Sequence, residues 1–108
     1  LLLSIPSMEY KLRFSKRFDR EFKKLDKPIR EGLWKKITKL KENPENQQHL
    51  HYMNLWEVRM DKFRLFYKIE QDKEEIWIIS VKHKDETDKY LRSGILEDVK
   101  NFLNDVSP

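Results

Sequence analysis

The sequence predicts an α+β fold. The expected order begins with an N-terminal strand and a helical hairpin. A three-stranded antiparallel meander then completes a four-stranded sheet, and a C-terminal helix follows it. Apolar residues recur at helical spacing over residues 18–40 and 95–106, whereas apolar and polar residues alternate over residues 55–67. With 108 residues, the chain is expected to form one domain, residues 8–108, behind an upstream or added tail at residues 1–7.

The first half of the chain predicts one strand and two helices. Residues 10–14 alternate between apolar and charged side chains, and Ser15 then suits the N-cap of a helix. Pro28 lies at or near the first position of a second helix. That helix ends before Pro44, because a residue that precedes proline avoids the helical region. The two helices are expected to form a hairpin that covers one face of the sheet.

The meander is centred on residues 55–67, which predict two strands around a tight turn at Asp61 and Lys62. Its apolar face comprises Trp56, Val58, Met60, Phe63, Leu65 and Tyr67. The opposite face carries Arg59 and Arg64 close to the turn. Two guanidinium groups on a rigid sheet indicate a site for an anion, and phosphate is the anion that we expect.

The second half of the chain completes the predicted fold. Residues 43–54 have no clear period and are expected to form a loop. Residues 76–82 predict a further strand, in which the side chains from Trp77 to Val81 alternate between the two faces. Both faces are partly apolar, as is typical of a central strand. Residues 93–106 predict the final amphipathic helix.

Composition narrows the class of protein. The chain has no cysteine, which excludes disulfides and thiolate metal sites. No apolar run approaches the roughly 20 residues that span a membrane. The net charge is +4, and residues 15–42 hold 11 basic against 5 acidic side chains. This excess favours nucleic acid or another polyanion as the partner; a solvated, lysine-rich helical surface is the alternative.

Three segments resemble the RelE/ParE toxin superfamily, and RelE-like mRNA interferases most closely. Residues 55–59 (LWEVR) resemble the second strand of the family, and residues 63–67 (FRLFY) resemble its third strand. Residues 78–86 (IISVKHKDE), followed by Tyr90, resemble the last strand and the basic exit from it. The likeness covers residues 9–103 and implies the RelE-like version of the predicted fold.

This resemblance implies a toxin of a type II toxin–antitoxin system that cleaves messenger RNA on the ribosome. The RNA 2′-hydroxyl would be the nucleophile, so neither a metal nor another cofactor is expected. The implied partners are a cognate RelB-like antitoxin, the ribosome and mRNA, in the cytoplasm and without a membrane. Two alternatives stay open: a ParE-like toxin that inhibits DNA gyrase and is no nuclease, and a catalytically inactive RNA-binding homologue.

The resemblance also implies a catalytic set. Arg64 and Arg59 would hold the phosphate and stabilise the charge that develops on it. Glu57 stands where RelE proteins usually carry a lysine, so this carboxylate is expected either to act as the base or to mark lost catalysis. Lys84 and Tyr90 occupy positions that RelE proteins use, and Tyr90 would transfer a proton or stack on a base.

His83, beside Lys84, is a further candidate because histidine titrates near neutral pH. Strand geometry points His83 and Lys84 to opposite faces, so at most one is expected to face the substrate. His49 and His51 could begin a zinc site, but no third ligand is evident, and RNA contact is expected instead. The predicted RNA-binding residues are Lys16, Arg17, Arg20, Lys23, Lys24, Lys35, Lys36, His49, His51 and Lys82.

Overall fold

The structure of the protein, a computed structural model, describes residues 9–105, so the tail predicted at residues 1–7 lies outside it. In chain order the elements are β1 (Lys11–Phe14), α1 (Lys16–Lys23), α2 (Lys27–Leu40), β2 (Gln48–Leu50), β3 (Leu55–Met60), β4 (Phe63–Glu70), β5 (Glu75–His83), α3 (Thr87–Ser93) and α4 (Ile95–Asp105). Short 3-10 helices are η1 (His51–Met53), η2 (Gln71–Lys73) and η3 (Lys84–Glu86). The α+β fold class is confirmed. No helix within residues 9–105 is long and apolar enough to cross a membrane.

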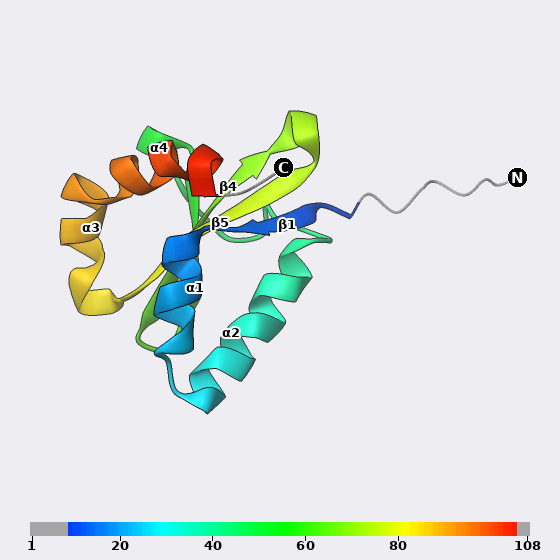
Figure 1. The fold of residues 1–108 in the computed structure, drawn as a ribbon. Helices are drawn as coiled ribbons and strands as arrows, with labels where there is room; N and C mark the ends of the chain where they lie inside the picture. The colour runs from blue at the N-terminus through cyan, green and yellow to red at the C-terminus, as the bar shows by residue number, and fades with distance from the viewer. Residues whose placement is uncertain (1–8, 106–108) are drawn as a thin grey trace, which may run out of the picture.

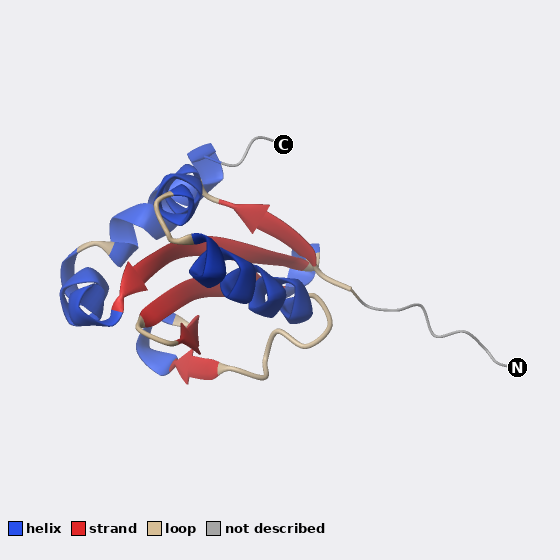
Figure 2. Ribbon diagram, turned by 90° about the horizontal axis from the view of Figure 1, so that it is seen from below, coloured by secondary structure: helices blue, strands red, loops and turns tan. Residues whose placement is uncertain are grey.

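A single sheet lies between two helical layers (Figures 1 and 2). Its strand order is β1-β5-β4-β3-β2; β1 runs parallel to β5, and the other neighbours are antiparallel. The helices α1 and α2 cover one face, where Leu33 and Ile37 pack on Tyr67 of β4. The helices α3 and α4 cover the other face, where Tyr90 and Phe102 join a second apolar cluster. Each face of the sheet therefore has its own core.

The sheet has five strands, so the prediction of four is wrong. The additional strand, β2, falls in the segment expected to be a loop. It has only three residues, and Gln48 and His49 are polar, so no apolar alternation marks it. It forms by pairing with β3, where Gln48 lies opposite Glu57. The predicted C-terminal helix corresponds to α4, and α3 precedes it; α3 buries only Tyr90 and is too short to show a period.

The hairpin between β3 and β4 has the predicted turn and register. Asp61 has a φ of 52°, in the left-handed region that Asp adopts more readily than most residues. Arg59 and Arg64 are direct cross-strand partners, as are Val58 and Leu65. The two arginines therefore share one face, and the apolar pair shares the other, as the alternation predicts.

The strand β5 contains a β-bulge that the sequence does not reveal. Phe66 pairs with Ser80 but Tyr67 pairs with Ile78, so Ile79 is an extra residue on β5. Consequently Ile78 and Val81 belong to the same core although they are three positions apart in the strand. The simple alternation predicted for this strand is therefore wrong beyond Ile79. The bulge also brings the residue after Val81 to the face of the two arginines.

The helix α1 covers the edge of β5 where β1 has ended. The Ser15 hydroxyl donates to the Ile79 carbonyl at 2.7 Å, and the Val81 N–H donates to Glu21 Oε1 at 3.1 Å. These side chains satisfy backbone groups that would otherwise lack partners at a sheet edge. Ser15 also accepts from the Phe18 N–H at 2.9 Å, which confirms it as the N-cap of α1. The start of α1 and the bulged half of β5 are thus fixed to one another.

The replacement Ile37→Ala tests the first core. Ile37 is fully buried between α2 and the sheet, so the cavity should lower the free energy of unfolding by about 2–5 kcal/mol. The exposed Lys36→Ala, on the same helix, should change it by less than about 0.5 kcal/mol. Urea titration followed by circular dichroism measures both. Equal effects of the two changes would contradict the described packing.

Candidate functional site

Three cationic side chains lie in register on the face that α3 and α4 cover. Arg59 on β3 pairs with Arg64 on β4, and Arg64 pairs with Lys82 on β5. Paired strands are about 4.8 Å apart, so the three side chains lie next to one another in one line. We call these three residues the cation row. Like charges directly opposite one another destabilise a sheet. The cation row therefore indicates a surface that holds an anion.

Arg59 is oriented by a buried carboxylate on its own strand. Its Nε donates to Glu57 Oε1 at 2.9 Å. Glu57 is only 4% exposed, whereas the Arg59 side chain is 62% exposed. Since the bond uses Nε, the two terminal nitrogens of the guanidinium stay available to an external oxygen acceptor. Glu57 thus fixes Arg59 and offsets part of its charge.

Arg64 is held by backbone instead. One of its terminal nitrogens donates to the carbonyls of Asp61 and Phe63, each at 2.9 Å. Among the residues that the structure describes, no carboxylate lies within ion-pair distance of Arg64. The turn therefore anchors Arg64 while leaving its charge without an acidic partner. It is the middle member of the row and the one best placed to attract an anion.

Lys82 is paired and sits against an aromatic ring. Its Nζ lies 2.5 Å from Glu21 Oε2 and 4.7 Å from the centroid of the Tyr90 ring. Glu21 also accepts from the Ser80 hydroxyl at 2.7 Å. The side chain of Lys82 is 17% exposed. This member of the row is thus largely enclosed between α1 and α3.

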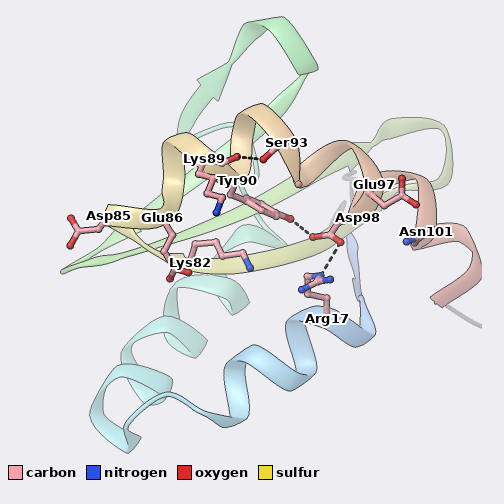
Figure 3. A pocket seen from close by; sticks show the side chains of 11 residues that line it. Arg17, Lys82, Asp85, Glu86, Lys89, Tyr90, Ser93, Glu97, Asp98 and Asn101 are labelled. Carbon is pink, nitrogen blue, oxygen red and sulfur yellow. Dashed lines mark hydrogen bonds and ion pairs between the residues drawn. The ribbon is translucent and has the colours of Figure 1, made fainter.

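Tyr90 is buried, and its hydroxyl is bonded to α4. The hydroxyl donates to Asp98 Oδ2 at 2.6 Å, and the Arg17 Nε donates to Asp98 Oδ1 at 2.8 Å (Figure 3). Burial raises the pKa of the Tyr90 phenol above its ordinary value, and the hydrogen bond to Asp98 raises it further. The phenol therefore stays protonated at neutral pH.

A pocket opens beside this set of residues. It has a volume of about 550 Å³, and its lining includes Arg17, Lys82, Lys89, Tyr90 and Asp98 (Figure 3). The lining combines an aromatic ring, three cationic groups and carboxylates from η3 and α4. The pocket thus lies next to the Lys82 end of the cation row and is formed by α1, β5, α3 and α4.

Lys84 and His83 end up in different surroundings. The exposed Lys84 lies in η3, and its N–H donates to the Lys62 carbonyl at 2.7 Å, which places η3 beside the β3–β4 turn. His83 contacts the Phe63 ring edge-on, with centroids 5.7 Å apart, and its Nδ1 accepts from the Asp85 N–H. His83 follows Lys82 directly and pairs with Phe63, so it points to the face opposite the cation row.

His49 and His51 lie apart from the row. His49 stacks on Trp56 with ring centroids 4.4 Å apart, and His51 meets His49 edge-on at 4.5 Å. Trp56 belongs to the face opposite Arg59, since the two residues are three positions apart on β3 and side chains alternate along a strand. Within the described part of the chain, no group of three or more potential ligands could hold a metal ion.

The predicted RNA-binding residues of the helical hairpin are largely solvent-facing. The exposed set comprises Lys16, Arg17, Arg20, Lys23, Lys24, Lys35 and Lys36. Arg17 differs from the others, because it is bound to Asp98. Two acidic residues of the site, Glu21 and Asp98, were not predicted. A signal existed for Asp98: it lies on the apolar stripe that Ile95 and Phe102 define on α4.

Comparison with known proteins agrees with this architecture. A family model described as the ParE toxin of the type II toxin–antitoxin system parDE matches residues 12–87. A chain of the intact E. coli RelBE toxin–antitoxin complex is 29% identical, with 68% of this chain and 95% of that chain covered and a TM-score of 0.64. An E. coli RelE double mutant in the free state is 26% identical, with 84% and 98% covered and a TM-score of 0.69.

A chain of the RelE–RelB complex from Pyrococcus horikoshii is 15% identical, with 70% of this chain and 96% of that chain covered and a TM-score of 0.61, and shows the fold alone. No curated protein matches the sequence. The fold is that of the RelE toxins. The chain belongs to the ParE toxin family, within the RelE/ParE superfamily, and is a RelE-like toxin of a type II toxin–antitoxin system. The predicted resemblance is confirmed.

Two buried phenols predict how stability depends on pH. Burial raises the pKa of both Tyr67 and Tyr90 above 10.0. Above pH 10, the unfolded chain therefore loses these protons while the folded chain keeps them, so stability falls as pH rises, by about 1.4 kcal/mol per pH unit for each phenol. Urea unfolding between pH 8 and about pH 11 measures this slope. The double variant Tyr67→Phe, Tyr90→Phe should show a flatter dependence, and an unchanged slope would contradict the assignment.

Proposed function

We propose that this toxin is a metal-independent endoribonuclease that cleaves mRNA on the ribosome, with the RNA 2′-hydroxyl as nucleophile. The observation that carries the proposal is the cation row. The row brings Arg59 and Arg64 to one face, where both can reach the same phosphate, and the central Arg64 has no acidic partner among the described residues. The similarity to E. coli RelE supports the same reading.

In the proposed reaction, the 2′-oxygen attacks the adjacent phosphorus, and the bond from phosphorus to the 5′-oxygen breaks. The 2′-hydroxyl gives up a proton and the departing 5′-oxygen takes one up, so the products are a 2′,3′-cyclic phosphate and a 5′-hydroxyl. Negative charge builds on the phosphoryl oxygens in between. The planar guanidinium of Arg64 suits two of these oxygens, and Arg59 shares the task.

Proton transfer is assigned to Lys84 and not to Tyr90 or His83. Lys84 is exposed beside the β3–β4 turn and is our candidate for the proton that the 5′-oxygen receives. Tyr90 is assigned a role through its ring, because its hydroxyl is bonded to Asp98 and its raised pKa disfavours a phenolate. His83 faces away from the cation row and is not assigned to the reaction.

A RelB-like antitoxin is the proposed protein partner. Solved complexes of RelE with RelB from E. coli and from P. horikoshii contain chains with this fold. Residues 15–42, which form the helical hairpin, hold 11 basic against 5 acidic side chains. An antitoxin with an acidic segment would complement this positive charge. When the antitoxin is absent, the phosphates of ribosomal RNA would bind the same basic side chains.

Inhibition of DNA gyrase, without RNA cleavage, is the second candidate. Two observations favour it: the matching family model is that of ParE, and Glu57 replaces the lysine usual in RelE proteins. The two candidates separate in one experiment. Purified toxin is incubated with mRNA in a ribosome-containing translation reaction and, in parallel, with gyrase and relaxed plasmid. We expect mRNA cleavage and unimpaired supercoiling; the reverse pattern would establish the second candidate.

The change Arg64→Ala should lower the rate of mRNA cleavage by about 10²–10³-fold, because it removes the central charge facing the phosphate. The matched control is Arg92→Ala, on α3, since the exposed Arg92 bonds only to a carbonyl of its own helix within residues 9–105. Cleavage is followed by primer extension, and thermal unfolding confirms that both variants fold. Equal activity of the two folded variants would remove Arg64 from the site.

The change Glu57→Gln distinguishes two roles for this carboxylate. Because Glu57 is buried and bonded to Arg59, we expect it to orient Arg59, and cleavage should stay within about tenfold of the unaltered rate. A general base contributes about 10²–10⁴-fold. A loss of that size in a folded Glu57→Gln variant would therefore identify Glu57 as the base.

A further inference from the structure

We propose that Asp98, held by Arg17, positions Tyr90 against the cation row, so that the helix α4 contributes a positioning residue to the active site. This inference rests on the proposed nuclease function. Two of its residues, Tyr90 and Asp98, lie beyond the segment 12–87 that the family model matches.

Both oxygens of the Asp98 carboxylate are used, and each binds a different element. Oδ2 accepts from the Tyr90 hydroxyl of α3 at 2.6 Å, and Oδ1 accepts from the Arg17 Nε of α1 at 2.8 Å. Asp98 is 8% exposed, and a buried charge is costly unless a counter-charge and hydrogen bonds satisfy it. Arg17 supplies the counter-charge and fixes the orientation of the carboxylate. The carboxylate in turn fixes the position of the Tyr90 hydroxyl.

The Tyr90 ring depends on this anchor because its own helix is short. The helix α3 has seven residues, and Tyr90 is the one it buries. The ring lies 5.6 Å from the Phe66 ring on one side, and the Lys82 ammonium lies 4.7 Å from its centroid. A Cβ atom at Gly94 would approach Tyr90 Cδ1 to 2.8 Å, so glycine is the residue that leaves room for the ring. A ring released from Asp98 would therefore shift against these neighbours, and the Lys82 ammonium is one of them.

The same network fixes Lys82, which belongs to the cation row. Lys82 is held between the Tyr90 ring and Glu21. Glu21 and Arg17 lie four residues apart on α1, so they occupy the same side of that helix. One side of α1 thus holds Lys82 directly and Tyr90 through Asp98. Loss of Asp98 should free the ring, and with it the lysine, without removing either from the chain.

The test is a double-mutant cycle in the ribosome-dependent cleavage assay, with Tyr90→Phe, Asp98→Ala and the double variant. Misplacement of a catalytic group by about 1 Å can cost about 10²-fold. We therefore expect each single change to lower kcat by about 10- to 10²-fold, with KM for the ribosome within about threefold. The double variant should keep about the same kcat as the less active of the two single variants, because both changes break the same hydrogen bond.

Two further variants keep the test decisive. Leu96→Ala, an exposed neighbour on α4 that does not line the pocket, should cleave at the unaltered rate. Gly94→Ala presses on the ring without touching the hydroxyl or Asp98, and should lower kcat as well. If Asp98→Ala does not fold by circular dichroism, Asp98→Leu, which has a similar size and no hydrogen-bond acceptor, replaces it in the cycle.

The outcomes separate this inference from the proposed function. If the unaltered protein cleaves mRNA and a folded Asp98 variant is equally active, the positioning role is overturned and the proposed nuclease function is retained. So would losses that multiply in the double variant, or a loss confined to KM. Absence of cleavage by the unaltered protein, with ribosomes and mRNA present, would overturn the proposed function and the inference together.

Discussion

Cross-strand register between β3, β4 and β5 is the constraint on which the site depends. Because paired residues of neighbouring strands share a face, the pairing of Arg59 with Arg64, and of Arg64 with Lys82, places three positive charges in one line. A shift of one residue in either pairing would turn part of the row into the core. The cores on both faces therefore stabilise the register that assembles the row.

Carboxylates neutralise the three cations to different degrees, so positive charge is distributed unevenly along the row. Arg59 has Glu57 and Lys82 has Glu21, whereas Arg64 is bonded only to the carbonyls of its turn among the described residues. The outer members are oriented by carboxylates that also reduce repulsion along the row. The central member keeps its full charge. Exposure decreases along the row, because Arg59 is exposed, Arg64 is half-buried and Lys82 is largely enclosed.

Much of the fold followed from the sequence because local patterns determine it. The alternation in residues 55–67 was sufficient to place Arg59 and Arg64 on one face, and the turn at Asp61 was sufficient to pair them. The strand β2 could not be predicted, since its three residues form a strand only because β3 offers an edge. The extra residue at Ile79 was equally hidden, because a bulge is set by the pairing of two strands and not by one strand alone.

The site was predicted less completely than the fold, for a related reason. Lys82 was expected to bind RNA, but only the bulge brings it into line with Arg64. Tyr90 was expected to transfer a proton or to stack on a base, and no local pattern in the sequence indicated that its hydroxyl is bonded to Asp98. Glu21 and Asp98 gain their roles from contacts with elements about 60 to 80 residues away in the chain. Such long-range contacts have no local signature.

Attack by the RNA 2′-hydroxyl is tested most simply by analysis of the RNA ends that the toxin produces on the ribosome. The comparison is an mRNA that carries a single 2′-deoxy nucleotide at the cleavage position. The account predicts a 2′,3′-cyclic phosphate and a 5′-hydroxyl from the normal mRNA and no cut at the deoxy position. Ends with a 3′-hydroxyl and a 5′-phosphate, or equal cleavage of the two messages, would contradict it.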